Sequence, residues 1–146
     1  MELYSLIISV LALIASVFTY LRHDKKLKEQ ERRINEYQLK QIEEENLENK
    51  KAAIRGNIVK GLKSGRTLKV YNSGRATARN IRVEGLDVNG IFYMRRDIFP
   101  YELMNPQDYT ELTMHLTCGC PSTIKLKYIW DDEYGNNNEF EQVLTI

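Results

Sequence analysis

Near its N-terminus the chain carries an apolar run, which gives way to polar residues and then to short stretches of alternating polarity. The 19 residues 3–21 include no charged side chain. As a helix they would span about 28 Å, which is close to the hydrocarbon thickness of a bilayer. Such a helix also closes its backbone hydrogen bonds internally, as lipid requires. The run therefore predicts one transmembrane helix over residues 1–21.

The residues that flank this run favour a retained anchor over a cleaved signal peptide. No Lys or Arg precedes the run, and no Ala-x-Ala cleavage site follows it. Basic residues gather directly after it: Arg22, Lys25, Lys26, Lys28, Arg32 and Arg33. The positive-inside rule then predicts a single-pass protein of the cell membrane, with its N-terminus outside and its C-terminal domain cytoplasmic. These cations also predict contact with anionic membrane lipid.

Small residues recur every three or four positions within the run. They are Ser5, Ser9, Ala12, Ser16 and Thr19. One side of the helix would therefore be small enough for close packing, which predicts self-association into a homo-oligomer. The alternative is that such residues are simply common in membrane helices.

Residues 22–51 are rich in Glu, Lys, Gln and Arg and contain no Gly or Pro, which predicts a helical stalk. Leu27, Ile34 and Gln41 stand seven residues apart, and Tyr37 fits the fourth position of the same heptad. Other apolar residues leave this register: Leu39, Ile42 and Leu47. A solvated stalk is the favoured interpretation, and a weak coiled coil is the alternative.

From residue 52 onward short alternating runs are separated by turn residues. They predict strands over residues 53–59, 67–71, 80–84, 91–94, 112–116, 124–130 and 140–146. The Asn89-Gly90 pair predicts a hairpin turn, and Pro100 and Pro106 punctuate a polar connection. About seven short strands in residues 52–146 are typical of an antiparallel β-sandwich, so the fold predicted is mainly β.

Alternation within these strands also predicts which side chains face the core. The predicted core residues are Leu68, Val70, Ile81, Val83, Leu112, Met114, Leu116, Ile124, Leu126, Tyr128, Trp130, Val143 and Ile146.

Two segments carry a resemblance to a known kind of domain. Residues 68–83 read LKVYNSGRATARNIRV, a strand, an Asn-x-Gly turn, small residues and a second strand, and residues 129–135 read IWDDEYG. Both are similar to the CARDB and related fibronectin-like domains of bacteria. The resemblance implies an Ig-like sandwich without enzymatic residues. Such modules are usually exported, whereas the charges beside the apolar run predict a cytoplasmic domain here.

The net charge of +1 conceals an uneven distribution of charge. Residues 50–100 hold 12 Lys or Arg and 3 Asp or Glu, whereas residues 101–146 hold 2 and 8. The candidate ligand- or partner-binding cations are Arg75, Arg79, Arg82, Arg95 and Arg96, with Lys63, Arg66 and Lys69 beside the first three. They would suit a phosphate-bearing ligand, or would simply be solvated cations that protect a sheet edge. Nucleic acid is not an expected partner.

Candidate chemistry is sparse along the chain. His115, Cys118 and Cys120 supply three of the four ligands that zinc needs, and strand alternation turns His115 away from Cys118, which is expected to be a small buried hydrophobe. Two such close cysteines fit a reducing compartment. The acidic residues of segment 131–139 are expected to form a solvated turn. No nucleophile elbow or phosphate-binding loop occurs in the sequence, so we expect neither catalysis, nor a metal, nor a cofactor.

These patterns together predict a non-enzymatic protein-interaction scaffold at the cytoplasmic face of a bacterial membrane. Its partner would be another protein, encoded nearby, which would bind at the loops of residues 73–78, 95–101 or 131–138. The alternative is a toxin-like or phage-defence-like sensor-effector, whose sandwich binds an anionic ligand or a protein signal before its membrane helices act.

Overall fold

The computed structural model describes residues 2–61 and 65–146, and Lys63 of the predicted basic group lies outside them. The chain divides into two compact units, Met1–Glu44 and Glu45–Ile146.

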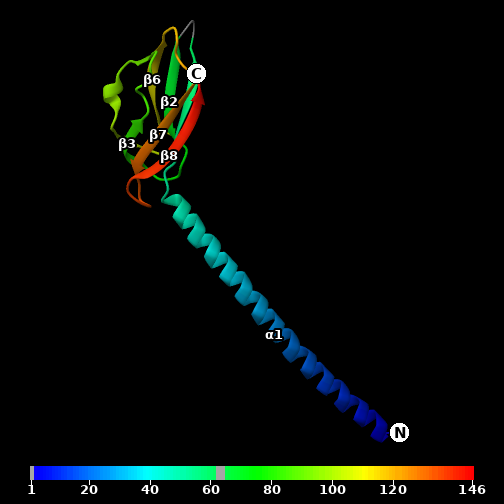
Figure 1. Cartoon of the computed structure of the whole chain (residues 1–146). Coiled ribbons are helices and arrows are strands. Elements are labelled where there is room, and N and C mark those ends of the chain that lie inside the picture. The colour runs from blue at the N-terminus through cyan, green and yellow to red at the C-terminus, as the bar shows by residue number, and fades with distance from the viewer. Residues whose placement is uncertain (1, 62–64) are drawn as a thin grey trace. The chain divides into compact units, whose positions relative to one another are not determined.

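One long helix, α1 (Glu2–Asn49), contains the apolar run and the polar residues after it (Figure 1). No Gly or Pro interrupts it. Ion pairs one turn apart support its polar part: Lys28 Nζ lies 2.8 Å from Asp24 Oδ2, and Arg33 Nη2 lies 2.7 Å from Glu29 Oε1. The helix is long and apolar enough near its N-terminus to cross a membrane.

The body after the helix consists of two antiparallel four-stranded sheets (Figure 1). The first sheet has the order β1-β2-β6-β4, and the second has the order β5-β3-β7-β8. The strands are β1 (Ile54–Lys60), β2 (Arg66–Asn72), β3 (Ala78–Glu84), β4 (Ile91–Tyr93), β5 (Tyr101–Met104), β6 (Tyr109–Leu116), β7 (Thr123–Asp131) and β8 (Asn138–Thr145). A 3₁₀ turn, η1 (Arg96–Ile98), and the cis peptide Phe99–Pro100 lie between β4 and β5. The prediction of a mainly β sandwich after one N-terminal helix is confirmed.

The strand order follows that of the immunoglobulin fold. In that fold strands A, B and E share one sheet, and strands C, F and G share the other. Here β1, β2 and β6 correspond to A, B and E, and β3, β7 and β8 correspond to C, F and G. The short strands β4 and β5 add one edge to each sheet.

The core lies between the two sheets and contains most of the predicted residues. Leu68, Val70 and Leu126 are fully buried, and Tyr128, the bulkiest of the fully buried side chains, packs among them. Val83, Leu116 and Ile146 are partly buried against this cluster.

Val143 is an error in the predicted core, because its side chain is 64% exposed. Alternation along β8 turns Phe140, Gln142 and Leu144 inward, so the intervening Val143 faces solvent. Leu144, which was not predicted, is the buried residue.

The Asn89-Gly90 turn exists but does not make a hairpin. Ile91 N–H donates to Val88 O (3.2 Å), and within the turn Gly90 has a positive φ of 84° whereas Asn89 does not. The hairpin type I′ needs positive φ at both central residues. The chain instead crosses from β3 in the second sheet to β4 in the first. The connection predicted around Pro100 also contains a short strand, β5, which was not predicted.

Candidate functional site

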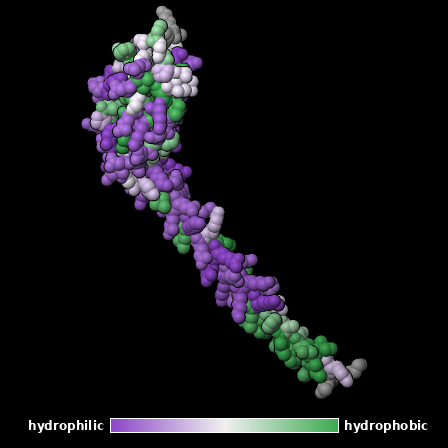
Figure 2. Space-filling model, viewed as in Figure 1, coloured by the Kyte–Doolittle hydropathy of each residue, from purple (hydrophilic) through white to green (hydrophobic). Residues whose placement is uncertain are grey.

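The apolar stretch of α1 is the largest uncovered hydrophobic surface of the first unit. Every side chain of residues 4–21 is exposed, and Figure 2 shows this stretch as hydrophobic, followed by a hydrophilic one. Two hydroxyls of the predicted small stripe bond to the helix itself: Ser9 Oγ donates to Ser5 O (2.9 Å) and Thr19 Oγ1 donates to Ala15 O (2.7 Å). The hydroxyls of Ser9 and Thr19 therefore have partners without water, which suits a lipid environment.

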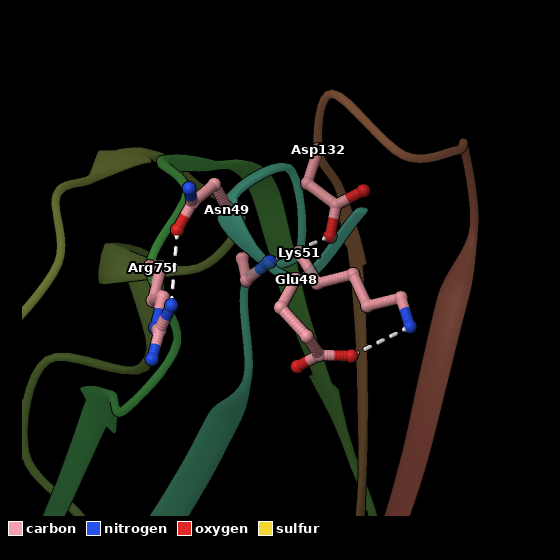
Figure 3. A network of polar contacts seen from close by, with 6 residues as sticks. Glu48, Asn49, Lys51, Arg75 and Asp132 are labelled. Carbon is pink, nitrogen blue, oxygen red and sulfur yellow. Dashed lines mark hydrogen bonds and ion pairs between the residues drawn. The ribbon is translucent and has the colours of Figure 1, made fainter. Parts of the chain in front are cut away.

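Arg75 lies in the β2–β3 loop and is engaged with residues that end the helix. Its Nη1 donates to Asn49 Oδ1 (3.2 Å) and lies 4.0 Å from Glu45 Oε1, and Figure 3 shows the contact with Asn49. Its backbone N–H donates to Lys51 O (3.0 Å). These contacts make Arg75 part of the attachment between the end of α1 and the sandwich.

Asp132 is the main acceptor in this attachment (Figure 3). Its Oδ2 accepts from Ala52 N–H (2.8 Å) and from Trp130 Nε1 (3.2 Å). Its Oδ1 accepts from the backbone N–H groups of Tyr134 (2.9 Å) and Gly135 (3.0 Å). One carboxylate thus joins residues 51–53, which follow the helix, to the β7–β8 turn.

Asn72 holds the other side of the same segment. This fully buried amide accepts from Ala53 N–H (3.1 Å) and Gly74 N–H (2.9 Å) through Oδ1. Its Nδ2 donates to Ala76 O (2.8 Å) and Met104 O (3.1 Å). Asn72 and Asp132 were expected only as turn residues, and no spacing in the sequence indicates that both bind one distant segment.

Lys51 completes the network with a side-chain pair. Its Nζ lies 2.9 Å from Glu48 Oε1 and 4.9 Å from the centre of the Tyr134 ring. The hydrogen bond from Lys51 holds the pKa of the Glu48 carboxyl below its usual value. The side chains of Lys51 and Arg75 are therefore both engaged with groups of the protein.

Arg79 and Arg82 lie on the outer face of the second sheet, whereas Arg75 contacts residues at the end of α1. Arg79 pairs in register with Asp131, and Arg82 Nη2 donates to Asn137 Oδ1 (2.6 Å). A β-bulge at Asn80 (φ 50°) lies between the two arginines and lets both face outward, because it interrupts the regular alternation of the strand. Hydrogen bonds from Asn137 N–H and Asn80 lower the pKa of the Asp131 carboxyl. This face therefore carries both positive and negative side chains, including the ion pairs Lys125–Glu141 and Lys127–Glu139.

Arg95 and Arg96 lie at the corner between β4 and η1. Arg95 adopts a left-handed backbone (φ 63°), whereas Arg96 pairs with Asp87 and donates to Leu86 O (3.3 Å). A shallow hollow of about 360 Å³ lies here, lined by residues 87–93 and Arg96. Two large apolar side chains, Phe92 and Met94, are more than half exposed beside it.

The His115, Cys118 and Cys120 positions do not converge. His115 faces solvent, where its Nε2 lies 3.2 Å from Met94 Sδ. Cys118 is exposed, contrary to expectation, because β6 ends at Leu116 and the chain turns through Gly119 (φ 89°). Cys120 instead packs partly against the core. Among the described residues no three His, Cys, Asp or Glu side chains are grouped so that they could hold a metal ion.

Comparisons of the chain with protein-family models, with curated proteins and with solved structures give no match. The expected kinship with CARDB-like domains therefore finds no support there and stays a prediction.

Proposed function

We propose that this protein is a membrane-anchored, non-enzymatic scaffold whose Ig-like sandwich, akin to a bacterial CARDB domain, binds another protein. The proposed arrangement is single-pass, with the N-terminus outside the cell and the sandwich in the cytoplasm. The cations that follow the apolar run support this orientation, because positive charge is retained on the cytoplasmic side.

The observation that carries the proposal is the uncovered apolar stretch of α1. Large apolar side chains such as Leu6, Leu11 and Leu13 are each 60% exposed or more. Contiguous exposed apolar surface of this kind marks contact with membrane or with another protein. The length of the stretch matches a bilayer, so lipid is the environment that fits it.

The β4–η1 corner is the sandwich surface that best suits a protein partner. Phe92 and Met94 are exposed there, next to Arg95. Aromatic residues, Met and Arg are the residue types enriched at protein interfaces. An anionic ligand has less support, since Arg75, Arg82 and Arg96 each donate to an oxygen of the protein itself.

Membrane anchoring is tested by flotation of the expressed full chain with vesicles. A charged residue at the helix centre costs about 2.5–3.5 kcal/mol of insertion free energy, so the double variant Leu11→Arg/Ile14→Arg should leave the membrane fraction. Leu39→Arg is the matched control, since it adds Arg at an exposed apolar site of α1 outside the run and should still float. Flotation of the double variant to the wild-type extent would refute the anchor.

Orientation and partner binding need separate measurements. A reporter fused after Ile146 should be protected from external protease in intact cells, and its cleavage there would refute the cytoplasmic placement. A photo-crosslinker at Phe92 should capture a defined protein, and Met94→Ala should weaken that capture. The control is a crosslinker at Tyr134, an exposed aromatic residue on the β7–β8 turn. Equal capture from both sites would refute the β4–η1 corner as the binding surface.

A further inference from the structure

The helix α1 carries a second periodic feature, which runs along both its apolar and its polar parts. Large side chains recur every seven residues at Leu6, Leu13, Tyr20, Leu27 and Ile34. Each of them is more than half exposed. A strict seven-residue repeat places its members along one slowly turning line of a helix, which is the first (a) position of a coiled coil.

The fourth (d) position of the same heptads changes character along the helix. Its residues are Ser9, Ser16, His23, Gln30 and Tyr37. Small residues in the apolar part let two membrane helices approach closely. Polar residues in the following part would fix the register of a helix pair but would add little to its stability. We call these ten a and d positions the seam.

Charges beside the seam are complementary for one orientation of two helices. The g positions after the apolar run are basic, with Lys26, Arg33 and Lys40, and the preceding e positions are acidic at Asp24 and Glu31. In a parallel pair each g residue faces the e residue of the next heptad of the partner, so Lys26 meets the partner copy's Glu31. An antiparallel pair would bring g against g and e against e, and like charges would meet.

The intramolecular ion pairs of α1 leave these two residues available. Lys28–Asp24, Arg32–Glu36 and Arg33–Glu29 all form within one helix. Within the described part of α1, neither Lys26 nor Glu31 makes an ion pair.

From the repeat, its exposure and the flanking charges, we infer that α1 pairs with α1 of a second copy of this chain, parallel and in register, along the seam. This inference rests on the proposed anchoring, because insertion of both helices in one membrane with the same orientation enforces the parallel arrangement. Pairing would place two sandwiches on the same side of the membrane and raise their avidity for a partner.

Disulfide scanning in phosphatidylcholine vesicles tests the seam in the full chain. Single cysteines replace Leu27 or Ile34 on the seam, in a background with Cys118→Ser and Cys120→Ala. Leu39→Cys is the matched control, because Leu39 is an equally exposed apolar residue at the f position, on the far side of the helix. Identical seam positions of a parallel pair come within the roughly 7 Å Cα separation that a disulfide allows, whereas f positions do not.

We expect oxidation to give dimers at positions 27 and 34 and at most traces at position 39. Equal cross-linking at position 39, or none at positions 27 and 34 in chains that float with the vesicles, would overturn the seam. Failure of the chains to float would instead count against the anchor, so the two failures are distinguishable.

A charge swap tests the orientation. Chains with Lys26→Glu should pair with chains carrying Glu31→Lys in preference to their own kind, by up to about fivefold for each restored pair. Förster transfer between differently labelled chains measures this preference. The matched control mixes Lys25→Glu with Glu29→Lys, which alters the same charges off the seam and should show none. A preference in the control equal to that of the test pair would overturn the parallel register.

Discussion

At the scale of single residues, Gly56 fits tightly against Tyr128. A Cβ on Gly56 would lie 1.9 Å from Tyr128 Oη and 3.0 Å from its Cζ. Tyr128 is fully buried, and its hydroxyl has no hydrogen-bond partner among the described residues. The phenol on β7 therefore occupies space that only a glycine on β1 leaves open.

Gly56→Ala should lower the free energy of unfolding by about 1–3 kcal/mol, because the core must shift to admit the methyl group. Urea unfolding of the full chain in detergent, followed by the fluorescence of Trp130, measures the loss. Gly135→Ala is the control, since its nearest atom would be 3.7 Å away, and it should change stability little. Equal losses in the two variants would contradict the steric explanation.

Tyr128→Phe removes the unpaired hydroxyl and should raise stability by about 1 kcal/mol. It should also relieve most of the Gly56→Ala penalty, because the shortest contact is with the removed oxygen. A double-mutant cycle with the same unfolding assay measures this coupling. Strictly additive effects would show that the methyl group is accommodated elsewhere.

At the scale of elements, Phe140 and Leu144 lie on the core side of β8, whereas Val143 lies on its solvent side. Leu144→Ala should cost about 2–4 kcal/mol of stability, because Leu144 is only 8% exposed. Val143→Ala should cost less than about 0.5 kcal/mol, as is typical of exposed positions. Thermal unfolding of the two variants compares them directly. A larger loss of stability for Val143→Ala than for Leu144→Ala would instead support the burial of Val143 predicted from the sequence.

The segment that follows the helix depends on the Asp132 carboxylate. Asp132→Ala leaves four N–H donors without their acceptor and should cost about 2–3 kcal/mol. The exchange of the Ala52 amide with solvent should become faster in the same variant. Glu133→Ala, a neighbouring exposed carboxylate without a hydrogen bond among the described residues, should change neither quantity. Unchanged exchange at Ala52 in the Asp132 variant would contradict this role.

The sequence was a good guide to elements with strong periodicity and a poor guide to elements defined by distant contacts. Alternation along residues 124–130 indicated β7 and its buried face, because period 2 is a local property. β5 was missed because a short edge strand beside Pro100 has a weak pattern. The roles of Asn72 and Asp132 depend on groups 19 and 80 positions away in sequence, which no local pattern encodes.

The contacts of the candidate site residues were harder to predict than the strands, because they join distant parts of the chain. The sequence groups Arg75, Arg79 and Arg82, but it does not indicate that Arg75 binds Asn49 or that Arg82 binds Asn137. The exposure of Phe92 and Met94 was not predicted, because a short alternating run does not reveal which of its faces is covered. Which face is covered became evident only from the pairing of β4 with β6 at the edge of the first sheet.

At the scale of the whole molecule, stability should depend on pH at both extremes. Hydrogen bonds lower the pKa of the Asp131, Glu141 and Glu48 carboxyls. The folding stability that these carboxylates contribute is present at pH values above their unfolded-state pKa, near 4. It is lost as the pH falls through their lower pKa in the folded state. Burial raises the pKa of the Tyr128 and Tyr93 phenols. Unfolded chains release these protons near pH 10 while folded chains retain them, so stability also falls above that pH.

Urea midpoints measured from pH 2 to pH 11 test this dependence. We expect a decline below about pH 4 and another above about pH 10. Asp131→Asn should make the acid decline shallower, and Tyr128→Phe should do the same for the alkaline decline. A wild-type midpoint that stays constant below pH 4 would contradict the acid part.

The outer edges of the two sheets have a consequence for aggregation. On one side Gln142 Oε1 accepts from Gly56 N–H (3.0 Å), and Arg55 Cζ lies 3.4 Å from the centre of the Phe140 ring. Part of the outer edge of β1 is therefore already occupied. On the other side the edges are β4 and β5, of three and four residues. Strand-by-strand growth into fibrils needs long edge strands whose backbone N–H and C=O groups are unpaired. The short β4 and β5 edges are therefore poor templates for such growth.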